Sequence, residues 1–109
     1  MKIALTTDGP GLDDAVSTRF ARSRYFLIVD ATTMQYDAVE NVAPLDVSSG
    51  LGLRAAWIVV NRRATVAVTG KLGSNARRIL DQHDVRIVTG ADGMSAREAV
   101  SRFGGGGSG

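Results

Sequence analysis

The spacing of apolar and polar residues divides this chain into short segments of two kinds. Apolar or alternating runs predict five strands, at 2–7, 25–30, 35–42, 65–70 and 85–90. The run YFLIVD at 25–30 is apolar at nearly every position, which is typical of a strand buried on both faces. The turn ATTM leads from it into 35–42, so we expect these two strands to form an antiparallel hairpin.

The stretch 43–64 fits either a strand or a helix. Its β-branched run at 58–60 favours a strand by propensity. A second set of apolar residues recurs at i, i+3, i+4 and i+7, as in a helix, and consists of Leu53, Ala56, Trp57 and Val60. Ser48 or Ser49 is available as an N-cap. The length and the spacing favour the helix, with this apolar set facing the core.

Two later segments, 74–83 and 95–103, have the spacing of amphipathic helices. Ser95 and Glu98 stand at the start of the second segment in the pattern of a capping box. The residues expected to face the core are Ala76, Ile79, Leu80, Ala96, Ala99, Val100 and Phe103. A strand, a helix and a strand within 65–90 form a βαβ unit, whose two strands should be parallel.

These elements together predict a single α/β domain over residues 1–103. The hairpin and the βαβ unit give a mixed five-stranded sheet covered by helices. The 109 residues are enough for one hydrophobic core. The segment 104–109 contains only glycine and serine, and we expect it to be a flexible tail.

The composition excludes several kinds of site. The chain has no cysteine and one histidine, which excludes disulfides, thiolate ligation of a metal and a conventional closed transition-metal site. The net charge of +2 is too small to require a nucleic-acid partner. No apolar run approaches the roughly 20 residues that cross a bilayer, and the first residues do not form a secretory signal. The cytoplasm is therefore the expected compartment.

Three arginines, Arg19, Arg22 and Arg24, come immediately before the strand at 25–30. They could form a solvated rim, contact nucleic acid or line an anion site. Arg19 and Arg22 are three residues apart and could face the same way in a turn. Arg24 leads into the strand and is expected to point elsewhere, so the first two are the candidate anion-binding pair.

The loop TGKLGSNA at 69–76 leaves a predicted strand and enters a predicted helix. The candidate binding residues in it are Gly70, Lys71, Gly73, Ser74 and Asn75. The glycines allow close approach of the backbone, the Ser–Asn pair could cap the helix, and the free N–H groups of a helix start bind anions. Ordinary turns have the same composition, and the spacing does not match a P-loop, so nucleotide is not favoured.

Five stretches of the chain, in order over residues 1–103, match the pattern of one known family. They are MKIALTTDG, VSTRFARSRYFLIVD, AVEN, VAVTGKLGSNARRIL and VRIVTGADGMSAREAV. Together they resemble the dinitrogenase iron–molybdenum cofactor biosynthesis family, the NifX/NafY-type domain, as a small stand-alone member. The resemblance implies a ribonuclease-H-like fold with three α/β/α layers. It also implies that the protein binds or carries an iron–sulfur or iron–molybdenum cluster, with metallocofactor assembly proteins as partners.

The chain departs from this family's pattern at one important position. The family has a motif similar to V-S-x-H-F-G-R, and its histidine is associated with cluster binding. In this chain Arg19 replaces that histidine and Ala21 replaces the glycine. Arginine stays protonated and cannot ligate a metal. We therefore expect no tightly bound metal, and an anionic cluster held by charge between Arg19 and Arg22 on one wall and the 69–76 loop on the other.

The favoured hypothesis is thus a carrier protein without catalytic residues, and two other classes stay open. A ribonuclease-H-type enzyme would need several carboxylates at set positions of the sheet, but KIALTTDG places only Asp8 near a strand end, and the other strands offer no obvious carboxylate partners for it. Asp8, Asp13 and Asp14 are expected to shape turns or to balance the arginines. A small nucleic-acid-binding or interaction module would use the arginines on phosphates. It would also need exposed aromatic residues, whereas the rings expected in the core are Trp57, Phe20 and Phe26; His83 is expected at the surface.

Overall fold

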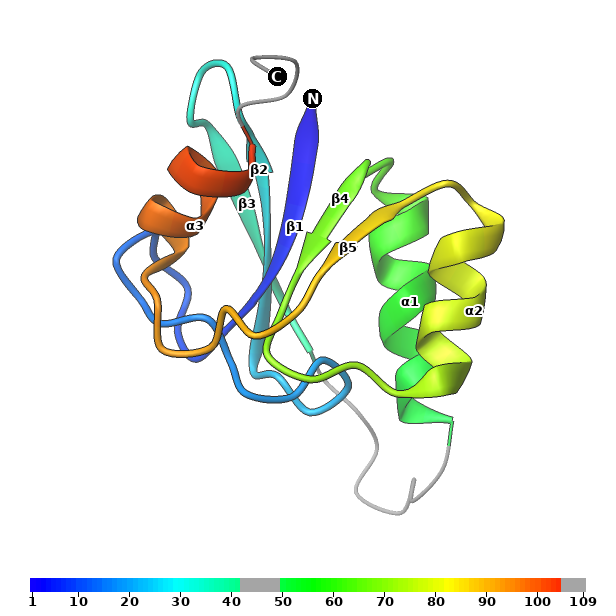
Figure 1. Cartoon of the computed structure of the whole chain (residues 1–109). Helices are drawn as coiled ribbons and strands as arrows, with labels where there is room; N and C mark the ends of the chain where they lie inside the picture. The colour runs from blue at the N-terminus through cyan, green and yellow to red at the C-terminus, as the bar shows by residue number, and fades with distance from the viewer. Residues whose placement is uncertain (42–49, 105–109) are drawn as a thin grey trace.

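The computed structural model of the chain describes residues 1–41 and 50–104. Its centre is a five-stranded sheet in the order β3-β2-β1-β4-β5 (Figure 1). The strands are β1 Lys2–Thr7, β2 Tyr25–Asp30, β3 Tyr36–Glu40, β4 Val66–Val68 and β5 Arg86–Val88. The five predicted strands are confirmed, and the last three are shorter than predicted.

The sheet is mixed, as the sequence predicts. β1 pairs antiparallel with β2, from Lys2 opposite Asp30 to Thr7 opposite Tyr25, and β2 pairs antiparallel with β3. On its other side β1 pairs in parallel with β4, and β4 pairs in parallel with β5. The hairpin and the βαβ unit therefore lie on opposite sides of β1, and the three parallel strands end at the same edge of the sheet.

Helices cover both faces of this sheet. Within residues 1–41 and 50–104, α1 spans Leu51–Asn61, α2 spans Ser74–Gln82 and α3 spans Ala96–Phe103. Figure 1 shows α3 on one face, with α1 and α2 side by side on the other. This is the three-layer α/β/α arrangement expected from the sequence. None of these helices is long and apolar enough to cross a membrane.

The alternation of side chains along the strands divides the apolar residues between two cores. From β1, Ile3 and Leu5 enter the core under α3, whereas Ala4 enters the core under α1 and α2. The β2 residues from Phe26 to Val29 are at most 5% exposed, so the prediction of a strand buried on both faces is confirmed. Phe20 packs edge-on against Phe26, with 5.8 Å between the ring centroids, which confirms that both rings lie in the core.

The structure confirms that this segment forms a helix, α1, but the face that it buries is not the predicted one. The buried residues are Ala55, Ala56 and Val59. Leu53 is 39% exposed and Trp57 is 42% exposed, so the expectation that Trp57 lies in the core is wrong. Residues 55–60 are apolar all round the helix, and the spacing alone therefore does not decide which face turns inward. The two buried alanines let the backbone of α1 come close to the sheet, while Trp57 stacks edge-on against exposed His83.

The starts of α1 and α2 lack the side-chain caps that the sequence suggested. Gly73 is the N-cap of α2, and no side chain caps it, because Ser74 and Asn75 already lie inside the helix. Gly50 is the N-cap of α1, again without a side-chain bond. The caps predicted for α1, at positions 48 and 49, lie outside the described residues. The N–H groups of both first turns therefore have no side-chain cap at the N-cap position.

Helix α3 is closed at both ends by hydrogen bonds. Glu98 N–H donates to Ser95 Oγ at 3.1 Å, as the capping pattern predicts. Gly104 N–H donates to Val100 O at 2.8 Å, and Gly104 is buried next to Ile3. Gly104 thus packs on the domain. The domain boundary at residue 103 stays a prediction, and the rest of the expected tail lies outside the described residues.

Candidate functional site

The carboxyl ends of β1, β4 and β5 lie together at one edge of the sheet, at the bottom of Figure 1. The chain leaves these ends in the loops 8–24, 69–73 and 89–95. Ligands of open α/β sheets favour this edge. The arginine segment and the glycine-rich loop that the sequence singles out both belong to it.

Main-chain hydrogen bonds hold these two segments side by side. Arg19 and Lys71 form an isolated parallel bridge. Lys71 N–H donates to Thr18 O at 2.6 Å, and Phe20 N–H donates to Lys71 O at 3.0 Å. Two cationic residues from distant parts of the sequence are thereby fixed next to each other at the candidate edge.

Gly70 is the residue that permits this bridge. Its N–H donates to Ser17 O at 3.0 Å, and a Cβ at this position would overlap the main chain of Thr18. The close approach predicted for Gly70 therefore brings two segments of the chain together. Gly73, in contrast, has open space where a Cβ would lie.

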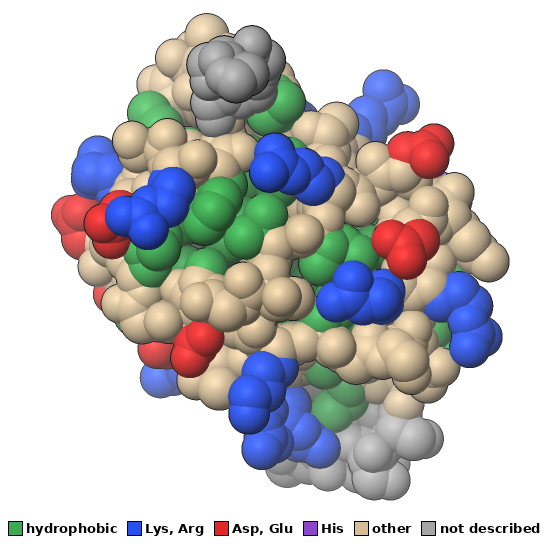
Figure 2. Space-filling model, viewed as in Figure 1, with side chains coloured by type: hydrophobic (Ala, Val, Ile, Leu, Met, Phe, Trp, Pro, Cys, Tyr) green, Lys and Arg blue, Asp and Glu red, His purple; other side chains and the backbone are tan. Residues whose placement is uncertain are grey.

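A hollow of about 230 Å³, here called the arginine hollow, opens beside the bridge. It is lined by Asp8, Ser17, Thr18, Arg19, Arg22 and Arg24. The three arginines are exposed, and they form no ion pair with any residue in the described ranges. Figure 2 shows one group of Lys and Arg side chains at this edge, the bottom of the view, with others spread over the rest of the face. Arg24 lines the same hollow as Arg19 and Arg22, contrary to expectation, because the segment turns at 21–22 before β2 begins.

Three of the other predicted binding residues, Gly73, Ser74 and Asn75, line a second hollow of about 340 Å³, here called the helix-start hollow, whereas Gly70 and Lys71 line neither of the two hollows. It lies between the first turns of α1 and α2, and its lining includes Gly50, Gly73, Ser74 and Asn75. Phe20 and Ala21 form a further part of its wall, directly next in sequence to Arg19 and Arg22 of the arginine hollow. The single two-walled crevice predicted from the sequence is thus divided in two, with one short segment contributing to both parts.

A buried hydroxyl network under the arginine hollow has no clear signal in the sequence. Ser17 Oγ donates to Asp8 Oδ1 at 2.9 Å and lies 3.1 Å from Ser23 Oγ. Ser23 Oγ in turn lies 3.0 Å from Thr7 O and 2.6 Å from Tyr25 O. Ser17 and Ser23 are at most 4% exposed. Serines in a polar, arginine-rich segment suggest an exposed loop, so the sequence alone does not indicate this network.

The remaining predicted candidates have structural roles. Asp14 Oδ2 accepts the N–H of Gly11 at 2.8 Å, which confirms a turn-shaping role. Arg97 Nε donates to Asp13 Oδ1 at 3.0 Å, and this bond lowers the pKa of the Asp13 carboxyl below its usual range. Among the described residues there is no group of three or more histidine, aspartate or glutamate side chains that could hold a metal ion.

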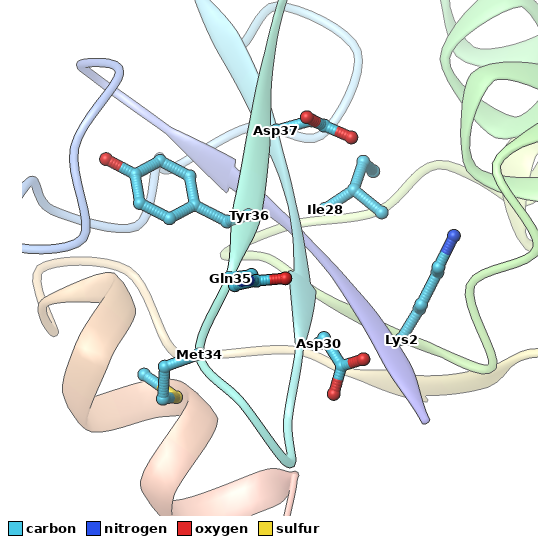
Figure 3. A pocket seen from close by; sticks show the side chains of 7 residues that line it. All are labelled: Lys2, Ile28, Asp30, Met34, Gln35, Tyr36 and Asp37. Carbon is cyan, nitrogen blue, oxygen red and sulfur yellow. The ribbon is translucent and has the colours of Figure 1, made fainter.

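The largest of the hollows described here, about 550 Å³, lies far from these residues, at the turn end of the β2–β3 hairpin. Figure 3 shows that the ring of Tyr36 points to the opposite side of the strand from Asp37 and Ile28. Asp30 there accepts the N–H groups of Thr32 at 2.8 Å and Thr33 at 3.3 Å, and these bonds lower the pKa of its carboxyl. This hollow is lined by two carboxylates, Asp30 and Asp37, and one cation, Lys2, so its size alone does not make it the better candidate for an anion.

Comparison with known proteins identifies the family. The model of the dinitrogenase iron–molybdenum cofactor family matches residues 1–106. The chain belongs to this family. The resemblance seen in the sequence is thereby confirmed over the whole described domain. No curated protein matches the sequence significantly.

Solved structures agree with this assignment. The apo form of the orange protein from Desulfovibrio gigas superimposes with a TM-score of 0.88 and is 38% identical, covering 94% of this chain and 85% of that one. A candidate NifB protein from Thermotoga superimposes with a TM-score of 0.75 at 25% identity, covering 96% of this chain and 88% of that one. This family and its orange protein relative link the chain to a small cofactor-binding or carrier role.

Proposed function

We propose that this protein is a non-enzymatic carrier of an anionic iron–sulfur or iron–molybdenum-type cluster during metallocofactor assembly. The observation that carries the proposal is the Arg19–Lys71 bridge, which fixes the cationic segment at the carboxyl edge of the parallel strands. Membership of the iron–molybdenum cofactor family supplies the class of cargo. The orange protein relative is described as an apo form, which implies that a fold of this kind takes up a further group.

The charge of the arginine hollow supports an anionic cargo. Arg19, Arg22 and Arg24 together present fifteen guanidinium N–H donors, at five each. A sulfide or carboxylate edge of a cluster accepts such hydrogen bonds without any metal–protein bond. Charge-assisted hydrogen bonds are stronger than those between neutral groups, and exposure of the arginines to water weakens them. Three such contacts therefore favour binding that is specific but reversible.

The size of the hollow favours a compact cargo. Its volume of about 230 Å³ is below the roughly 300–1,000 Å³ that is common for pockets of organic ligands. The helix-start hollow next to it could accept a part of the cargo that extends beyond the arginines. The N–H groups of Ser74 and Asn75, which line that hollow in a first turn without a side-chain cap, are then available as donors to that extension.

The residues of the site favour a carrier function over catalysis. In the described chain the arginine hollow contains one carboxylate, that of Asp8, and no histidine. Arginine neither ligates a metal nor exchanges a proton near neutral pH. A protein of this kind takes its cargo from one assembly protein and gives it to another, and we propose such donors and acceptors as its partners.

Anaerobic loading tests this function. The protein is mixed with a synthetic anionic iron–sulfur cluster or an iron–molybdenum–sulfur cluster, passed through gel filtration, and analysed for metal and sulfide. We expect cluster metal and sulfide to elute with the protein in fixed proportion, and to leave it at high salt because the binding is electrostatic. Protein fractions without metal and sulfide would contradict the proposal. If the protein instead binds nucleic acid tightly and in a salt-sensitive way, the alternative function of a nucleic-acid-binding module is favoured.

A further inference from the structure

One side chain in the arginine hollow has the wrong charge for an anion site. Asp8 follows the last residue of β1, and its carboxylate shares the hollow with Arg19, Arg22 and Arg24. It forms no ion pair with any Lys or Arg in the part of the chain that the structure describes. Its negative charge therefore acts on the arginines through space, and their N–H donors stay available to a ligand.

The fold holds this carboxylate in place. Asp8 N–H donates to Ala15 O at 3.0 Å, and Asp8 Oδ1 accepts the hydroxyl of Ser17 at 2.9 Å. Ser17 is itself fixed, because it is 4% exposed and its N–H donates to Thr6 O at 2.8 Å. A buried serine hydroxyl thus holds an acidic side chain at the hollow.

We propose that Asp8 is the residue that keeps anion binding in the arginine hollow weak enough for the cargo to leave. This inference rests on the proposed function only in that the hollow binds anions. The carboxylate lowers the positive potential of the hollow while the guanidinium donors still decide the geometry of the contact. A carrier needs this combination, because donors make the binding specific and a reduced potential lets the cargo dissociate at a useful rate.

Coulomb's law makes the proposal quantitative. The repulsion between Asp8 and a bound anion grows in proportion to the anion's charge. Removing the carboxylate should therefore tighten binding by a constant factor for each negative charge on the ligand. For charges a few ångströms apart in a solvated hollow at low salt, that factor is about threefold per charge.

The experiment compares Asp8→Asn with Asp13→Asn. Asparagine has the shape of aspartate, and its amide oxygen can still accept the Ser17 hydroxyl, so the first variant removes the charge and keeps the anchor. Asp13 lies in the same loop but is paired with Arg97 and is absent from the lining of the hollow, so the second variant is the control for net charge. Perchlorate, sulfate and trimetaphosphate serve as monovalent, divalent and trivalent probes, measured by calorimetry at low ionic strength.

For Asp8→Asn we expect dissociation constants lower by about threefold, tenfold and thirtyfold for the three probes, with slower release. Asp13→Asn should change each constant by less than about twofold. Unchanged or weaker binding in Asp8→Asn, an equal gain in Asp13→Asn, or no binding of any probe to any variant would overturn the inference. If the dissociation constants of the three simple anions change by these increasing factors but no metal–sulfur cluster binds, the role of Asp8 stands and the proposed cargo is rejected.

Discussion

Arg19 and Lys71 lie next to each other because the chain between Ser17 and Phe20 pairs with the chain after β4 as a short parallel bridge. The bridge consists of main-chain bonds, so it does not depend on which side chains stand at these two positions. The arginine segment is thus attached to the carboxyl edge of the sheet and is not a free loop. Changes that disturb the bridge should disturb both the fold and the site, whereas changes of its side chains should affect only binding.

Gly70→Ala should break the bridge. The added Cβ would overlap the main chain of Thr18, which cannot move aside as the end of a flexible side chain can. We expect a loss of about 1–3 kcal/mol in the free energy of unfolding, as for other overpacked sites, and weaker anion binding. Chemical denaturation and anion titration measure the two effects.

Gly73→Ala is the matched control for this change. Nothing lies within 4 Å of a Cβ at Gly73, and its φ of −77° suits alanine. Its free energy of unfolding should fall by no more than about 1 kcal/mol, because alanine is a poorer N-cap residue than glycine but meets no steric overlap here. A Gly70→Ala variant as stable as Gly73→Ala would show that the bridge is not a fixed part of the fold.

Leu80 and Leu53 test which helix faces form the core. Leu80 of α2 is fully buried, whereas Leu53 of α1 is 39% exposed. Leu80→Ala should lower the free energy of unfolding by about 2–5 kcal/mol, and Leu53→Ala by less than about 1 kcal/mol. Denaturant unfolding of both variants checks the difference. Equal losses would mean that α1 packs through the face first expected from its sequence.

Asp30 makes the stability of the β2–β3 hairpin dependent on pH. Two backbone N–H groups, from Thr32 and Thr33, lower the pKa of its carboxyl in the folded chain. A lowered folded pKa means that the carboxylate stabilises the fold above the unfolded pKa, and that this contribution is lost as pH falls below about 4. Asp30→Asn should therefore melt slightly below the parent at pH 7, with the gap closing in acid.

Asp37→Asn is the control for that measurement, because Asp37 is an exposed carboxylate within strand β3 and not in the turn. The melting temperature of Asp37→Asn should equal that of the parent at pH 7 and at pH 3. A gap between Asp30→Asn and the parent that persists unchanged at pH 3 would mean that the carboxylate charge of Asp30 has no part in closing the hairpin.

The elements of the fold were readable from the sequence because their signals are local. Strand β2 is apolar at successive positions, and Ser95 with Glu98 marks the start of α3. The face of α1 was not readable, because its apolar residues surround the helix and only packing against the sheet selects the side with Ala55 and Ala56. Trp57 was misplaced for this reason.

The sequence predicted several residues of the site but not how they are arranged. The sequence pointed to Arg19, Arg22 and the loop that contains Gly70, and the structure brings these segments together at one edge. It did not show that Arg24 shares the hollow, or that Asp8 is anchored there by a buried serine, since both depend on contacts between residues distant along the chain.

Cluster affinity in arginine variants tests the central claim most directly. The parent, Arg19→Ala/Arg22→Ala and Arg78→Ala/Arg86→Ala are titrated anaerobically with the same synthetic anionic iron–sulfur cluster, with melting curves alongside. Arg78 and Arg86 are exposed and absent from the lining of both site hollows, so the second pair controls for the loss of two charges. We expect the first pair to weaken binding by about two orders of magnitude or more and the second by less than about threefold, with little change in stability. Equal affinity of Arg19→Ala/Arg22→Ala and the parent would contradict the account and leave these arginines as a solvated rim.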